Sequence, residues 1–153
     1  TDRRLRKKSA VQRYCMVENI EGVIVTPLNI IEVKGGDVMH AMKKTDSGFD
    51  GFGEAYFSKI EKDFIKAWKL HNSMTLNLVV PFGGVKFVLS DRTKFQEVIL
   101  SKDNFARLTI PPGIWFGFQG LHGPLSIVLN LANIVHNEGE VITEELGFID
   151  YKW

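Results

Sequence analysis

Two ionisable side chains, Lys69 and His71, lie two positions apart in the otherwise apolar stretch IKAWKLH. A run of this kind is typical of a β-strand, in which residues two apart project from the same face. An imidazole exchanges protons near neutral pH, and an ammonium stabilises a developing negative charge. Lys66, Asn72 and Asn77 extend this polar cluster, which therefore predicts a functional site. The structural alternative is a lone histidine satisfied at the edge of the core.

The histidines, His40, His71, His122 and His136, do not have the spacing of a metal site. In a β-barrel such a site needs two histidines at i and i+2 on one strand. Here the residue two before His71 is Lys69, and lysine is a poor ligand because it is normally protonated. We therefore expect no bound metal. The sequence also lacks a P-loop, a Gly-x-Ser-x-Gly motif and a dinucleotide-binding fingerprint.

The composition is that of an ordinary soluble domain, with 44% hydrophobic and 24% charged residues in a chain of 153. A formal net charge of +1 gives no reason to expect a nucleic-acid partner or an acidic membrane surface. No apolar run is long enough to predict a membrane-spanning helix. The single cysteine, Cys15, excludes an internal disulfide and favours a reducing, cytoplasmic setting.

The N-terminal segment, residues 1–21, differs in charge from the rest of the chain. Its opening stretch TDRRLRKKSAVQR contains six basic residues and one acidic residue. Two interpretations remain open: an arm that binds anions, and a solvated, flexible leader. We expect residues 22–153 to form one domain.

From Gly22 onward, short strand-like segments alternate with turn residues at roughly 8–12-residue spacing, which predicts an all-β sandwich or barrel. The stretch MTLNLVVPFGGVKFVLSD predicts a hairpin that turns at Gly83 and Gly84. DVMHAMKK predicts one or two helical turns. The tail EGEVITEELGFIDYKW, residues 138–153, is expected to pack back on the sheet through its aromatic end.

The most specific segment is RLTIPPGIWFGFQG, in which two prolines and a glycine end a strand and fix the turn after it. IPPGIWFGF resembles the Ile-Pro-Pro-Gly-x-x-His-Gly-Phe segment of the dTDP-4-keto-6-deoxyhexose 3,5-epimerases of the rhamnose pathway. IKAWKLH is similar to their Leu-Arg-Gly-Leu-His strand, and FGEAYFS resembles the strand before it. The resemblance covers residues 22–153. It implies a cupin, or jelly-roll, β-sandwich barrel that forms a homodimer.

The resemblance also implies a reaction. The substrate would be a nucleotide-linked 4-keto-6-deoxy sugar of deoxysugar or surface-polysaccharide biosynthesis. A base removes the proton beside the ketone, an enolate forms, and an acid returns a proton. No cofactor is implied, because the ketone itself acidifies the C–H bond. The alternative is a catalytically inactive cupin that binds a sugar nucleotide or a protein partner.

Aligning the motifs assigns roles to individual residues. The family's base histidine aligns with Lys69, its strand arginine with Lys66, and its histidine after Pro-Pro-Gly with Phe116. Lys69 would be the base if burial and neighbouring charges lower its pKa. Alternatively, His71 is the base and Lys69 pairs with the enolate. Tyr56 is the remaining candidate for a phenolic acid.

A further set of residues is expected to bind the substrate: Lys66, Glu54, Asn77, Arg107, Trp115 and Gln119. Arg107 would pair with a phosphate or with a surface acid, and the sequence leaves both open. Trp68 and Trp115 are expected in the core, with stacking on the nucleotide base as the alternative.

Overall fold

The structure, a computed structural model, describes residues 18–153, so most of the predicted basic arm lies outside the described residues. The described chain joins the domain before Gly22. Ile20 is buried in the main core, and its backbone N–H donates to Gln96 Oε1 at 2.8 Å. No helix within residues 18–153 is both long and apolar enough to cross a membrane.

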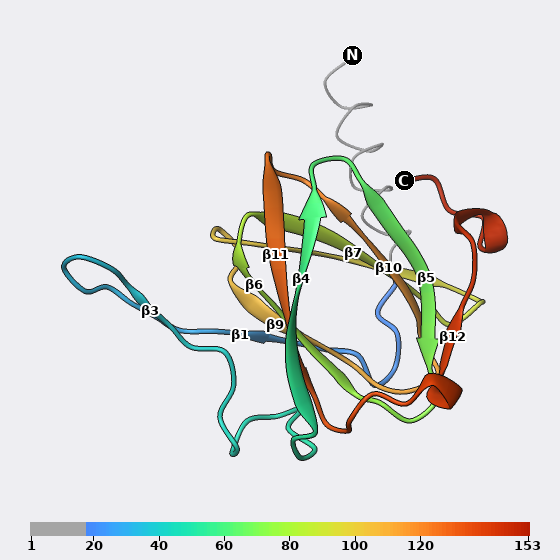
Figure 1. Ribbon diagram of the computed structural model, residues 1–153, viewed down its shortest axis with the longest axis horizontal. Coiled ribbons are helices and arrows are strands. Elements are labelled where there is room, and N and C mark those ends of the chain that lie inside the picture. The colour runs from blue at the N-terminus through green and yellow to red at the C-terminus, as the bar shows by residue number, and fades with distance from the viewer. Residues whose placement is uncertain (1–17) are drawn as a thin grey trace, which may run out of the picture.

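Two five-stranded antiparallel sheets and a small hairpin make up the fold (Figure 1). The first sheet has the order β1 (Ile24–Pro27), β9 (Ala106–Ile110), β6 (Leu76–Phe82), β11 (Leu125–Ala132) and β4 (Glu54–Glu61). The second has the order β12 (Val141–Thr143), β5 (Ile65–His71), β10 (Trp115–Gly120), β7 (Gly84–Ser90) and β8 (Phe95–Ser101). The hairpin consists of β2 (Ile30–Ile31) and β3 (Val38–Met39). The all-β prediction is confirmed.

Alternation along the strands divides the side chains between two cores. On β7, Val85, Phe87 and Leu89 point between the sheets and join the main core, while Val88 points to the opposite face. A second, smaller cluster forms on that opposite face around Trp68. Residues two apart on a strand share a face, so the same alternation that fills the core also aims polar side chains into the space between the sheets.

The predicted hairpin at Gly83 and Gly84 is wrong in its pairing. β6 and β7 are both strands, but β6 belongs to the first sheet and β7 to the second. Gly83 supplies the positive φ of +86° at the crossing, and a Cβ there would lie 2.1 Å from Ser126 Oγ. The glycines therefore serve a tight passage between the sheets, which requires the same backbone freedom as a hairpin turn.

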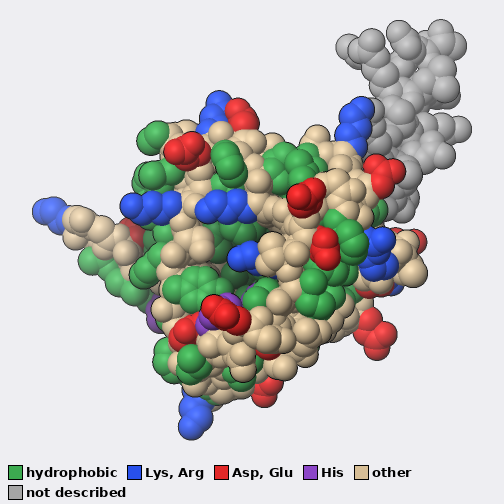
Figure 2. Space-filling model, turned by 45° about the vertical axis from the view of Figure 1, so that its right-hand side comes forward, with side chains coloured by type: hydrophobic (Ala, Val, Ile, Leu, Met, Phe, Trp, Pro, Cys, Tyr) green, Lys and Arg blue, Asp and Glu red, His purple; other side chains and the backbone are tan. Residues whose placement is uncertain are grey.

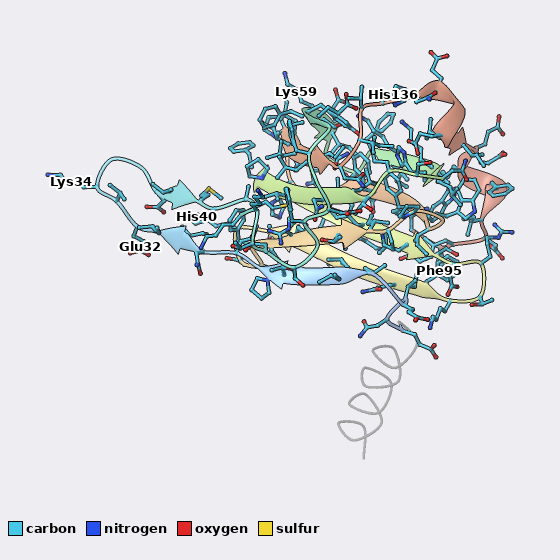
Figure 3. The ribbon with its side chains drawn as sticks, turned by 90° about the horizontal axis from the view of Figure 1, so that it is seen from below. Glu32, Lys34, His40, Lys59, Phe95 and His136 are labelled. Atoms are coloured by element: carbon cyan, nitrogen blue, oxygen red, sulfur yellow. The ribbon has the colours of Figure 1, made fainter. Side chains whose placement is uncertain are left out.

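The predicted helical turns in DVMHAMKK are also wrong, because Val38 and Met39 form β3. The β2–β3 hairpin projects from the body of the molecule, with Glu32 and Lys34 at its far end (Figure 3). Several of its apolar side chains are exposed. Ile31 and Val38 each retain 50% of their accessible surface.

The C-terminal tail returns to the second sheet, as predicted. After η1 (Glu138–Glu140) the chain adds β12 to the edge of β5, and it continues through η2 (Leu146–Phe148). Tyr151 and Trp153 then pack on Trp68, with ring centroids 6.4 and 5.4 Å away. Trp68 also donates its indole N–H to the carbonyl of Leu146 at 3.0 Å. The tail thus covers the outer face of β5.

Candidate active site

A cavity of about 370 Å³ opens between the two sheets, and Figure 2 shows a hollow with basic side chains and a histidine beside it. Strands of both sheets line it, together with the loop that carries His136. The polar and ionisable lining residues are Tyr56, Ser58, Lys66, Lys69, His71, Asn130, His136 and Thr143. Among residues 18–153, no Asp or Glu lines the cavity, so its fixed charges are positive and suit an anionic ligand.

His71 is the buried ionisable group of this cavity. It lies at the end of β5, and its Nδ1 is hydrogen-bonded to Glu140 Oε1. The pairing of β5 with β12 explains this contact, because Val141 is the register partner of His71 and Glu140 directly precedes it. The ring of Phe116 stacks against the imidazole at 5.9 Å with an interplanar angle of 16°. Carboxylate and stacked ring together fix the orientation of the imidazole.

The carboxylate of Glu140 is held ionised. Burial alone would raise its pKa, but the hydrogen bond from His71 and those from the backbone outweigh burial and lower the pKa below its usual value. Its Oε2 accepts the N–H groups of Ser73 and Met74, both at 3.1 Å. An ionised carboxylate at Nδ1 keeps the proton on that nitrogen. Nε2, which has no hydrogen bond within the described chain, is then the nitrogen available to a ligand.

The two lysines of β5 also line the cavity, although they are three residues apart. The register between β5 and β10 shifts, so that Phe116 pairs with Lys69 and Gly117 with Ala67. The shift is a β-bulge in which Trp68 is the extra residue. Beyond Trp68, the side chains that face the cavity change from even-numbered to odd-numbered positions. Lys66 and Lys69 can therefore reach the same space while Trp68 points to the tail. Lys69 is exposed, so the burial on which its role as a base depends is not observed.

Tyr56 faces the cavity from β4, in the opposite sheet. Its register partner on β11 is Asn130, whose Nδ2 donates to the tyrosine hydroxyl at 3.0 Å. All three residues expected to be catalytic, Lys69, His71 and Tyr56, thus line one cavity, as does Lys66.

The other expected binding residues do not line this cavity. Asn77 is buried on the far face of the first sheet, where it binds the carbonyl of Gly48 and the hydroxyl of Thr109. Arg107 lies nearby and is fully buried. Its guanidinium donates to the carbonyls of Ala41 and Ser47 at 2.8 and 2.9 Å and contacts Asp46 at 3.3 Å.

Arg107→Met is expected to lower the free energy of unfolding by about 2–3 kcal/mol, because it strands the oxygens of residues 41–47 that the guanidinium now satisfies. Urea unfolding measures this loss. At a concentration where the variant stays folded, its affinity for a nucleotide should equal that of the wild type. A selective loss of nucleotide affinity without a loss of stability would instead restore the phosphate-binding hypothesis.

Trp115, Gln119 and Glu54 also lie outside the cavity lining. Trp115 packs on Phe148 of the tail, 5.0 Å between ring centroids, on the outer face of the second sheet. Gln119 is half-buried and donates weakly to the carbonyl of Asp63. Glu54 accepts the backbone N–H of His136 at 3.0 Å and so supports the loop at the cavity rim rather than the cavity itself.

Four residues in or beside the cavity were not predicted from the sequence: Glu140, Asn130, Ser58 and His136. Glu140 is 69 residues from His71, and its own neighbours do not mark it as functional. The β-branched residues Val141, Ile142 and Thr143 were the available indication, because they predict a short strand that would carry Glu140 to the sheet edge.

Within residues 18–153, no three His, Cys, Asp or Glu side chains gather as a metal site would require. The absence of a metal and of a cofactor remains a prediction.

Comparison with solved structures places the chain among sugar-nucleotide enzymes. A dTDP sugar isomerase from Desulfovibrio desulfuricans is 33% identical, with a TM-score of 0.83 over 88% of this chain and 92% of that one. A sugar 3,4-ketoisomerase from Thermoanaerobacterium thermosaccharolyticum, in complex with TDP, is 22% identical, with a TM-score of 0.71 over 81% and 89%. A dTDP-6-deoxy-D-glucose 3,5-epimerase from Legionella pneumophila, in complex with dTDP-4-keto-L-rhamnose, is 18% identical, with a TM-score of 0.74 over 86% and 77%.

No family model matches the sequence, and a search of curated proteins found no match. The two sheets and the cavity between them define a cupin-type β-sandwich. The identity and coverage of the Desulfovibrio structure identify the family. The chain belongs to the cupin dTDP-sugar isomerases. It shares its fold with the Legionella 3,5-epimerase.

Proposed function

We propose that the protein is an isomerase or epimerase that acts on a dTDP-linked 4-keto-6-deoxy sugar in deoxysugar or surface-polysaccharide biosynthesis. The observation that carries this proposal is His71, which buried Glu140 orients from behind the cavity wall, in a cavity that also presents Lys69 and Tyr56. A base, a cation and a phenol around one space are the groups that enolate chemistry needs. The Desulfovibrio dTDP sugar isomerase and the Legionella epimerase, in complex with dTDP-4-keto-L-rhamnose, support this substrate class.

In this mechanism His71 Nε2 takes the proton from the carbon beside the ketone. The electrons of the C–H bond form the C=C bond, and those of the carbonyl move to oxygen. Lys69, on the same face of β5, stabilises the enolate oxygen. The carbonyl then re-forms as a proton from the Tyr56 hydroxyl is transferred to the substrate. The imidazolium and the phenolate finally exchange protons with solvent, which restores both groups.

Between the two hypotheses for the base, the geometry favours His71. Its imidazole is buried and oriented by a carboxylate that stabilises the imidazolium formed on proton transfer. Lys69 has no such partner among residues 18–153 and is exposed. Lys66, whose Nζ donates to the carbonyl of Lys59 at 2.7 Å, remains available at the rim for the diphosphate.

Proton exchange tests the proposal directly. Incubation with dTDP-4-keto-6-deoxyglucose in heavy water should introduce deuterium at C3, at C5 or at both, as observed by NMR. If dTDP binds but no 4-keto sugar exchanges a proton, the alternative of a binding protein without catalysis replaces the enzymatic function. The label's position also distinguishes 3,5-epimerisation from chemistry confined to C3 and C4.

We further propose a homodimer with a cytoplasmic location, the latter supported by the single cysteine, Cys15. The projecting β2–β3 hairpin supports the dimer. Two short strands with exposed Ile31, Val33, Val38 and Met39 are not stable alone in water, and a second copy would cover them.

Light scattering at micromolar concentration is expected to give twice the mass of one chain. The double substitution Ile31→Lys and Val38→Lys should shift the mass toward that of the monomer, because it places two charges in the contact. A matched change at the exposed Phe64, Phe64→Lys, should leave the mass unchanged. A wild-type monomer under these conditions would contradict the dimer.

A further inference from the structure

Asn130 is buried beside the cavity and contacts Tyr56, but the proposed reaction gives it no role. It is 2% exposed and lies on β11, between Tyr56 on one neighbouring strand and Leu78 on the other. Its side chain therefore bridges the cavity-facing phenol and the backbone of β6. Such a buried amide is retained only when its donors and acceptors are satisfied.

The hydrogen-bond partners fix which way this amide faces. The backbone N–H of Asn77 donates to Asn130 Oδ1 at 3.2 Å, and because an N–H can only donate, the atom at this position must be the oxygen. Nδ2 consequently points to the other side. There it donates to the hydroxyl of Tyr56 at 3.0 Å and lies 3.9 Å from Met74 Sδ.

An amide that donates to a phenol determines how the phenol can bond. The oxygen of Tyr56 is the acceptor in this contact, so its own proton is not consumed by Asn130. That proton remains free to be donated into the cavity. The same N–H also stabilises negative charge on the oxygen after the proton has left.

We infer that Asn130 is a positioning residue, which orients Tyr56 so that its hydroxyl proton points at the substrate. The inference rests on the proposed function, in which Tyr56 returns the proton, and it assigns a role to a residue outside the reacting set. It predicts that the direction of the Asn130–Tyr56 hydrogen bond, rather than its presence, governs proton return.

Asn130→Asp tests this direction with almost no change in shape. The introduced carboxylate still accepts the N–H of Asn77, but it can only accept from Tyr56 and therefore draws the phenolic proton away from the cavity. Product formation should fall at least about tenfold, as in Tyr56→Phe, while deuterium exchange catalysed by His71 stays within about threefold of the wild type. The ratio of exchange to product is the decisive quantity.

Asn133→Asp is the matched control. Asn133 lies just beyond the end of β11, and its Oδ1 also accepts a backbone N–H, that of Thr75 at 2.8 Å, but it does not line the cavity. This variant should keep the wild-type ratio of exchange to product even if it loses stability. An unchanged ratio in folded Asn130→Asp would overturn the inference, as would an equal change in Asn133→Asp.

A measurement independent of activity separates this inference from the proposed function. In ¹⁵N NMR spectra, Tyr56→Phe should shift the Nδ2 proton signals of Asn130 and leave those of Asn133 in place. If the Asn130 signals do not move, the contact is wrong and the inference falls. If they move but the wild type shows neither exchange nor product with any 4-keto sugar nucleotide, the proposed function fails and the orientation of Tyr56 stands.

Discussion

His71→Ala is expected to lower the rate of deuterium exchange into a dTDP-4-keto sugar by about 10²- to 10⁴-fold, the usual contribution of a general base. The imidazole is the group in the cavity that a carboxylate orients, and no other nitrogen there has such a partner among residues 18–153. Added imidazole should restore part of the rate, because the truncation leaves room for it beside a cavity of about 370 Å³. NMR of the substrate provides the measurement.

His136→Ala is the matched control, since it removes an imidazole that lies at the exposed rim of the same cavity. Its effect on exchange should be less than about tenfold, and added imidazole should not change it. A different pair of variants identifies the base if this expectation is wrong. If His71→Ala leaves exchange intact while Lys69→Met stops it, Lys69 is the base and the proposed roles of the two residues must be reversed.

Glu140→Gln should reduce turnover by about 10²- to 10⁴-fold while leaving the fold intact. The amide has the shape of the carboxylate, and its oxygen can still accept the N–H groups of Ser73 and Met74. Its nitrogen then faces His71 Nδ1 and donates to it. This forces the proton of the imidazole onto Nε2, the position from which the base must act. Glu138→Gln, two residues earlier and exposed, should change turnover by less than about twofold.

The difference in stability between the wild type and Glu140→Gln should decrease as the pH falls. The pKa of Glu140 is lower in the folded protein than its ordinary value of 4.5, so the carboxylate stabilises the fold fully above that pH. The contribution is lost as the pH falls through the folded-state pKa. Urea unfolding should therefore show the wild type losing its advantage over Glu140→Gln below about pH 4.5. An advantage that grows toward low pH would contradict a folded-state carboxylate of lowered pKa.

The features that sequence predicts well are those that neighbouring residues determine. The alternation in β4 and β11 is local, and it predicts strands with one face toward the core. Lys69 and His71 could be placed together because both lie on β5. The pairing of β6 with β7 was predicted wrongly because the glycine-rich turn at Gly83 permits both a hairpin and a crossing to the other sheet.

The features that sequence misses depend on distant segments. The charge of Arg107 suggested a ligand, but residues 41–47 fold over it and supply the oxygens that a phosphate would have supplied. Glu140 could not be assigned to His71 before the pairing of β12 with β5 was known. Asn130 is hidden for the same reason, since its partners lie on β4 and β6 rather than along its own strand.

The shortness of β12 has a consequence for how the protein opens in the native state. The three residues of β12, with backbone bonds of Glu140 and Glu144 on either side of them, pair this segment with β5 at the sheet edge. Detaching such an edge requires far less free energy than global unfolding and leaves the core between the sheets intact. The N–H groups of Trp68 and Asn72 donate to the carbonyls of Glu144 and Glu140 at 2.9 and 2.7 Å. In amide hydrogen exchange we expect both to open with this segment, at a lower free energy than global unfolding. Each such excursion releases the base from its carboxylate, so catalytic competence follows the docked population of the C-terminal segment rather than the stability of the whole domain.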